Sequence, residues 1–142
     1  MTMAETQTLT ITRRFATSPE RLFDAWIDPK IAAAWLFTGP TSQAHQAELD
    51  ARVGGRWRIT DTRDSVTYEA IGEYLEIDRP RRLVFSFAMP QFDLRAARVT
   101  VEIAPDGAGS RLTLTQAPVP AEAQAPLEEG WRQMFEGLEK AA

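Results

Sequence analysis

A single arginine interrupts the apolar side of the first strand-like segment. Residues 8–15 (TLTITRRF) alternate apolar side chains with threonines, a period of two that indicates a β-strand, and Arg13 falls on the apolar side. A guanidinium there must meet an anion or reach solvent, because an unpaired buried charge is costly. It can pair with Glu73, Asp24 or a backbone carbonyl, or extend to solvent. Alternatively, it holds the carboxylate or phenolate of a bound ligand.

Other side chains that could do chemistry are few. Cysteine is absent, and the only histidine, His45, lies in the polar stretch TSQAHQAE, which favours a solvated loop over a general base. No cluster of His, Asp and Glu has metal-ligand spacing. Glu69 and Glu73 share one side of a strand-like segment, and a solvated sheet surface explains them better than paired acid and base work. We therefore expect no metal and no cofactor, and we favour a binding protein over an enzyme.

Two short helices are expected after the first strand. Ser18 followed by proline is typical of a helix N-terminus, and Asp28 followed by proline ends that helix and caps a second one. Because proline cannot continue a helix, the two helices must meet at an angle. Each carries one large aromatic side chain, Trp26 in the first and Trp35 in the second.

Five or six strand-like segments follow between residues 46 and 116, separated by turn sequences such as DTRDS, DRPRR and PDGAGS. Apolar and polar residues alternate along them, which is typical of an antiparallel sheet with one apolar and one wet face. The alternation changes phase around Gly72, which predicts a β-bulge there. The last segment has apolar residues at helical spacing from Leu127 to Leu138, and only this helix is long enough to cover the apolar face.

This order of elements resembles that of a known superfamily, as do the sequences ITRRF, RLFDAWIDP, GGRWRIT, GEYLEIDRPRRLVFSF, VTVEIAPDGAGSRLTLTQ and EEGW. They are similar to the SRPBCC superfamily of START-like, helix-grip proteins, in the branch named for homologues of the activator of the heat-shock protein 90 ATPase. The resemblance covers about residues 8–140 and implies a single α+β domain over residues 1–142. In that fold a curved antiparallel sheet wraps a long C-terminal helix, and two short helices after the first strand close one end.

The resemblance also implies a ligand cavity between the sheet and the long helix. Its expected lining is mainly apolar and aromatic: Trp57, Ile59, Tyr68, Phe85, Phe87 and Val101 from the sheet, Trp131, Met134 and Phe135 from the helix, and Arg13 as a polar group. Such a lining suits an apolar or aromatic small molecule. The same residues would equally make an ordinary filled core, and a sequence carries no volume that distinguishes the two.

Three functions are compatible with this fold. The first is a small binding protein that encloses a hydrophobic or aromatic molecule. The second is a cyclase or hydrolase type of enzyme that uses the same cavity, with Arg13, Tyr68 or Tyr74 stabilising developing charge. The third is a chaperone-associated interaction protein like the ATPase activators. It is the least expected, because the chain as it stands leaves no room for the separate N-terminal domain that eukaryotic activators use.

Composition argues against other partners. A net charge of −4 over 142 residues gives no field that would attract nucleic acid or an anionic membrane. The arginines alternate away from the aromatic residues that an RNA-binding sheet would need beside them. No stretch approaches the roughly 18 apolar residues of a membrane span, and the N-terminus lacks the pattern of a signal peptide. We expect a soluble cytoplasmic protein, and the sequence carries no signal for its oligomeric state.

Overall fold

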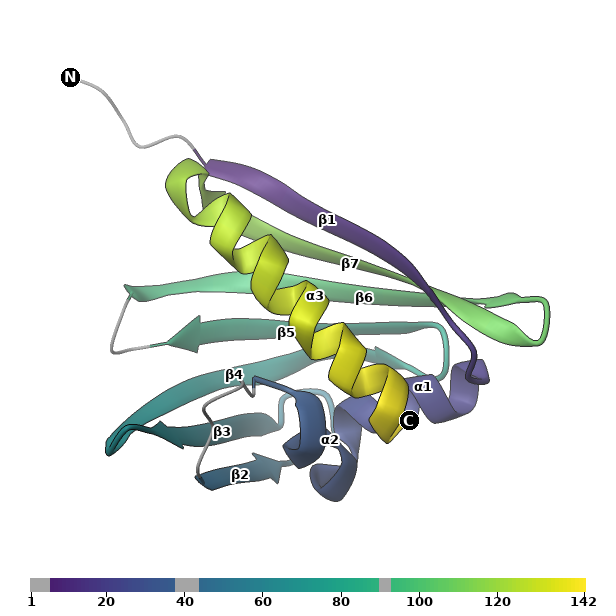
Figure 1. Ribbon diagram of the computed structural model, residues 1–142, viewed down its shortest axis with the longest axis horizontal. Coiled ribbons are helices and arrows are strands. Elements are labelled where there is room, and N and C mark those ends of the chain that lie inside the picture. The colour runs from purple at the N-terminus through teal and green to yellow at the C-terminus, as the bar shows by residue number, and fades with distance from the viewer. Residues whose placement is uncertain (1–5, 38–43, 90–92) are drawn as a thin grey trace.

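A curved antiparallel sheet and one long helix dominate the computed structural model (Figure 1), which describes residues 6–37, 44–89 and 93–142. For residues 44, 45, 63 and 93–96 it describes the backbone alone. In chain order the elements are β1 (Thr6–Phe15), α1 (Pro19–Ile27), α2 (Pro29–Trp35), β2 (Ala44–Leu49), β3 (Arg56–Arg63), β4 (Val66–Asp78), β5 (Arg82–Met89), β6 (Asp93–Asp106), β7 (Gly109–Pro120), the 3₁₀ turn η1 (Ala121–Ala123) and α3 (Gln124–Ala141).

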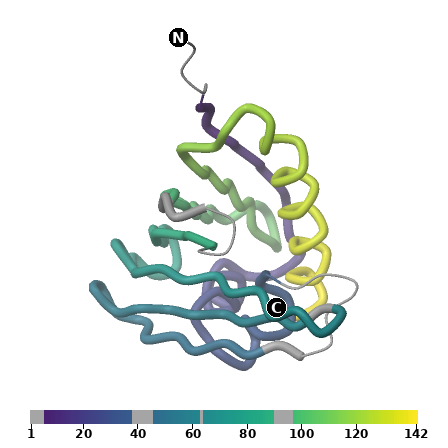
Figure 2. The backbone as a smooth tube through the Cα atoms, turned by 90° about the vertical axis from the view of Figure 1, so that its left-hand side faces the viewer, coloured from purple at the N-terminus to yellow at the C-terminus, as the bar shows by residue number. Residues whose placement is uncertain are grey.

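The sheet is continuous across all of the described strands. Its order is β1-β7-β6-β5-β4-β3-β2, and every neighbouring pair is antiparallel. Figure 2 shows its curvature, with α3 running along the concave side. Trp131, Phe135 and Leu138 are the buried residues of α3, whereas Glu136 is exposed. The predicted helix-grip architecture is therefore confirmed.

The two short helices meet at Asp28, as the sequence predicts. Ser18 caps α1 through its side chain, and the Asp28 carboxylate accepts backbone N–H groups at the start of α2. The resulting angle brings Trp26 and Trp35 together edge to face, with ring centroids 4.7 Å apart. Both rings are buried, and α1 and α2 close the end of the curved sheet near the C-terminus of α3 (Figure 1).

The prediction of a loop around His45 is wrong for the backbone. Residues 44–49 form β2, which pairs with β3 at the edge of the sheet, so that Ala47 lies opposite Ile59 and Leu49 opposite Trp57. The segment has only a short apolar alternation, and its strand conformation depends on pairing with β3. The side chain of His45 lies outside the part of the chain that the structure describes.

The predicted bulge exists, but it lies at Leu75 and not at Gly72. Ile71 pairs with Ala88 and Tyr74 with Phe85 in one register, and the register of β4 against β5 shifts between Tyr74 and Glu76. Leu75 is the extra residue, and its side chain is exposed. Because of this shift, the alternating apolar residues before and after Leu75 lie on the inner face of the sheet.

Candidate functional site

Aromatic side chains fill the middle of the space between the sheet and α3. Neighbouring rings have centroids 4.7 to 6.4 Å apart, and the members are Trp26, Trp35, Phe37, Trp57, Phe85, Phe87, Trp131 and Phe135. The space left between Trp26, Trp57, Tyr74 and their neighbours is about 10 Å³. Such a void holds about one water molecule at most, so this part of the interior is a packed core.

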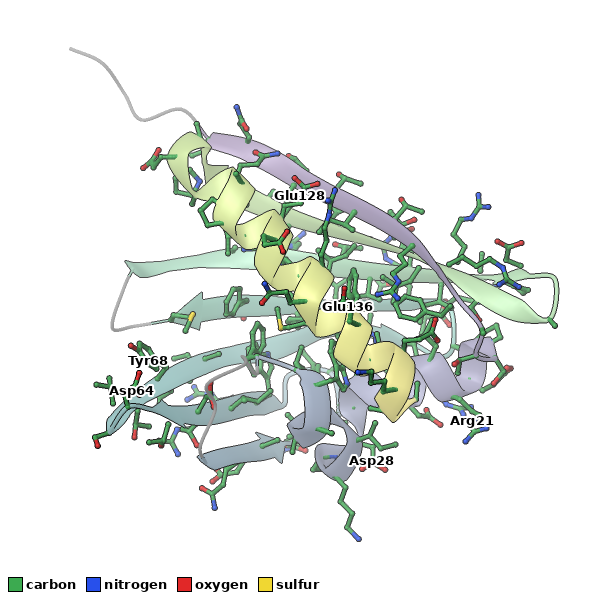
Figure 3. All side chains as sticks on the ribbon, viewed as in Figure 1. Arg21, Asp28, Asp64, Tyr68, Glu128 and Glu136 are labelled. Atoms are coloured by element: carbon green, nitrogen blue, oxygen red, sulfur yellow. The ribbon has the colours of Figure 1, made fainter. Side chains whose placement is uncertain are left out.

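Most of the residues predicted to touch a ligand belong to that packed core. Trp57, Phe85, Phe87, Trp131 and Phe135 are members of the aromatic cluster, and Ile59 and Val101 are buried beside it. Met134 is half-buried, and its Sδ accepts the backbone N–H of Phe37 at 3.0 Å. Tyr68 is half-buried and lies toward the β3–β4 hairpin, near Asp64 (Figure 3). That any of them contacts a ligand stays a prediction.

Arg13 lies apart from this cluster's centre, at the side of α3. Its guanidinium carbon is 4.9 Å from the centroid of the Phe15 ring, a cation–π distance, and the side chain is half-buried. One partner expected from the sequence, Asp24, is instead bound by Arg79 through two hydrogen bonds of 2.7 and 2.9 Å. Stacking on Phe15 together with access to solvent accounts for an arginine on the apolar side of β1.

An open apolar groove of about 380 Å³ lies beside the packed core, at the N-terminal end of α3. Its described lining comes from the ends of three strands, η1 and the first turn of α3, and the residues are Phe87, Ala88, Met89, Ala97, Gln116, Pro118, Pro120, Ala123, Pro126 and Leu127. None of these residues is charged. The volume falls within the range of small-molecule sites in proteins. Of the residues predicted from the sequence, Phe87 is the one that reaches this groove.

Gln116 is the polar residue among the described lining of the groove, and it is not among the site residues predicted from the sequence. It is 3% exposed, and its Oε1 accepts the indole N–H of Trp131 at 2.8 Å. Leu112, Leu114 and Gln116 are successive inward-facing residues of β7. A polar residue on the apolar side of a strand is the signal that singled out Arg13, and the same signal would have found Gln116.

A second hollow, of about 710 Å³, lies over strands β2 to β5 and has a different character. Charged side chains of both signs line it, namely Glu48, Asp50, Arg56, Arg58 and Glu73. Arg58 already forms an ion pair with Glu69, and both lie on the wet face of the sheet. Leu49, Trp57 and Ile71 also line the hollow, but an apolar molecule that covered it would remove water from these charged side chains.

Tyr74, a buried residue of β4, has a strongly raised pKa. Burial raises the pKa of its hydroxyl above the ordinary value of 10.0, and the negative charge of Asp50 raises it further. Above about pH 10 the unfolded chain loses this proton before the folded chain does, so stability should fall as the pH rises. Urea unfolding between about pH 9 and pH 12 should show a smaller alkaline loss for Tyr74→Phe than for the wild type. Identical pH profiles for the two proteins would contradict this assignment.

Among the described residues, no group of three or more His, Cys, Asp or Glu side chains could hold a metal ion. Within residues 6–37, 44–89 and 93–142, no helix has the length and apolar character needed to cross a membrane.

Similarity to known proteins extends over almost the whole chain. The family model described as Activator of Hsp90 ATPase homolog 1-like protein matches residues 16–142. A crystal structure from Rhizobium loti is 28% identical, with a TM-score of 0.80 and coverage of 99% of this chain and 100% of the other. One from Chromobacterium violaceum is 25% identical, with a TM-score of 0.82 and 94% of each chain covered.

At lower identity, the AHSA1-like protein from Aeromonas hydrophila shares the fold. Its solution structure is 21% identical to this chain, with a TM-score of 0.80, and the match covers 95% of this chain and 91% of that one. No curated protein matches the chain.

Proposed function

We propose that this chain, which belongs to the family of Activator of Hsp90 ATPase homolog 1-like proteins, binds an apolar small molecule in the groove at the start of α3. The family and the helix-grip fold agree with the resemblance found in the sequence. The position of the groove differs from the position that the resemblance implies for a cavity. The centre of the interior is filled, and the open space lies toward the N-terminal end of α3.

The proposal is supported by a groove of ligand size whose described lining residues are uncharged and which lies beside a packed aromatic cluster. Phe87 belongs both to the groove and to the cluster, where its ring stacks on Phe37 at a centroid distance of 4.8 Å. A bound molecule would therefore meet a surface that is already ordered, which lowers the entropic cost of binding. The lining residues that the structure describes offer carbon surface and one side-chain amide, so we propose binding without covalent chemistry.

Filling the groove with a large side chain should abolish binding. Ala97 points inward from β6 and lines the groove, so the indole of an Ala97→Trp variant would occupy the space of a ligand. We expect Ala97→Trp to weaken the binding of ethylbenzene at least about tenfold relative to the wild type. The measurement is an NMR titration of the ¹⁵N-labelled protein with ethylbenzene, a neutral apolar probe.

Ala104→Trp is the matched control for this test. Ala104 is on the same strand, but its side chain is exposed on the opposite face of the sheet. The control should bind ethylbenzene as the wild type does. Equal binding by wild type and Ala97→Trp, or equal weakening in both variants, would rule out the groove as the site.

A further inference from the structure

Gln116 places one fixed polar group in a groove whose other described lining side chains are apolar. Its side chain is 3% exposed, faces inward from β7 and contributes to the groove lining. A buried amide carries one acceptor oxygen and two N–H donors, and each group left without a partner costs stability. The partners of this amide therefore indicate what the groove is built to hold.

The orientation of the Gln116 amide follows from its partner. The indole of Trp131 can only donate, so the atom 2.8 Å from its Nε1 must be the amide oxygen of Gln116. This contact commits the oxygen to the protein and directs the NH₂ group away from Trp131. Trp131 is 1% exposed and packed among the aromatic rings, so the orientation is held firmly.

The NH₂ group of Gln116 has no acceptor among the described residues. Its nitrogen is not one of the fully buried side-chain atoms that lack a hydrogen-bond partner. Two hydrogen-bond donors are thus available to whatever occupies the groove. The other described lining residues supply only apolar side chains, and none is cationic. A carboxylate would lose its hydration there without gaining a counter-charge.

We infer that the molecule held in this groove is neutral and carries a hydrogen-bond acceptor, such as a ketone, ester or ether oxygen, that pairs with the Gln116 NH₂ group. This inference rests on the proposed function and names the ligand class for the same groove. Ligands without an acceptor would leave the buried donors unpaired, and sites built around such donors discriminate against them. Gln116 is accordingly the specificity-determining residue of the groove.

The test compares two probes of nearly equal shape, acetophenone, which has a carbonyl oxygen, and ethylbenzene, which has none. Their dissociation constants are measured by NMR titration for the wild type and for Gln116→Leu. Because hydration differs between the probes, the informative quantity is the ratio of the two constants in each protein. Gln116→Leu should shift this ratio about tenfold against acetophenone.

A second measurement needs no variant and so does not depend on how Gln116→Leu folds. In the wild type, acetophenone should shift the side-chain amide resonances of Gln116, and ethylbenzene at the same occupancy should leave them nearly unchanged. Benzoate, which has the same ring with a charged carboxylate, should bind more weakly than acetophenone.

The outcomes separate this inference from the proposed function. If neither acetophenone nor ethylbenzene binds, the proposed function fails and the inference fails with it. If both bind but the ratio is the same in the two proteins and the Gln116 amide resonances do not respond, the groove binds ligands and the inference alone is overturned. Preference for benzoate over acetophenone would also overturn it, because the ligand would then be anionic.

Discussion

Replacing Trp26 with alanine should lower the free energy of unfolding by about 3–5 kcal/mol. The Trp26 ring is 1% exposed and contacts the rings of Trp35, Phe85, Trp131 and Phe135, with centroids 4.7 to 6.4 Å away. Its removal would leave a cavity at the junction of α1, α2, α3 and the sheet, where the remaining rings come from α2, β5 and α3 and cannot all move to close it. Urea denaturation of the purified variant measures the loss.

Trp26→Phe is the control that separates packing from hydrogen bonding. The indole N–H of Trp26 is buried and has no hydrogen-bond partner among the described residues. Phenylalanine therefore removes ring volume without breaking a hydrogen bond, and its cost should be clearly smaller than that of alanine. A loss below about 1 kcal/mol for Trp26→Ala would mean that the aromatic cluster is not the packed core described above.

Gly72→Ala should destabilise the protein by about 2–4 kcal/mol, although it adds only one methyl group. A Cβ at Gly72 would collide with the backbone carbonyl oxygen of Ser86 and with the indole nitrogen of Trp57. Those two atoms are hydrogen-bonded to each other at 3.2 Å. The methyl group would therefore force apart β3, β4 and β5 and break this hydrogen bond, since the obstructing carbonyl belongs to the backbone.

Gly130→Ala is the matched control for this substitution. A Cβ at Gly130 would meet no atom within 4 Å, and the residue lies inside α3. Alanine there should raise stability by about 0.5–1 kcal/mol, because glycine is unfavourable in the interior of a helix. Thermal or urea unfolding should thus move in opposite directions for the two variants. A Gly72→Ala protein as stable as the wild type would contradict the close approach of β4 to β5.

The sequence predicts the helices and the faces of the strands because their signals are local. The caps at Ser18 and Asp28 depend on residues only two or three positions away, and both are confirmed. Trp57 and Ile59 alternate with arginines, which suffices to place them on the inner face. The element order, together with stretches such as GGRWRIT and VTVEIAPDGAGSRLTLTQ, likewise indicates the helix-grip fold and the family.

Non-local features were predicted less well. The bulge lies at Leu75 because pairing with β5 sets the register of β4. The glycine at residue 72 gives no information about that pairing. Strand β2 was missed because its short polar sequence becomes a strand only beside β3.

The position of open space depends on the packing of side chains from the whole fold. The sequence identifies Trp57, Phe85 and Trp131 as inner-face residues, but it does not show that they pack against one another and fill the centre. The groove arises where β7 ends in the proline-rich segment that leads to η1 and α3. Three alanines, Ala88, Ala97 and Ala123, are part of its lining, and they carry no pattern of their own in the sequence.

An apolar binding site at the start of α3 is tested most directly by mapping where acetophenone and ethylbenzene bind the wild-type ¹⁵N-labelled protein. We expect saturable changes of the backbone amide resonances of Ala97, Ala123 and Leu127, which line the groove. The resonances of Arg58 and Glu73, on the wet face, should stay unchanged. No saturable change at any resonance with either probe, or changes confined to the wet face, would contradict an apolar binding site at the start of α3.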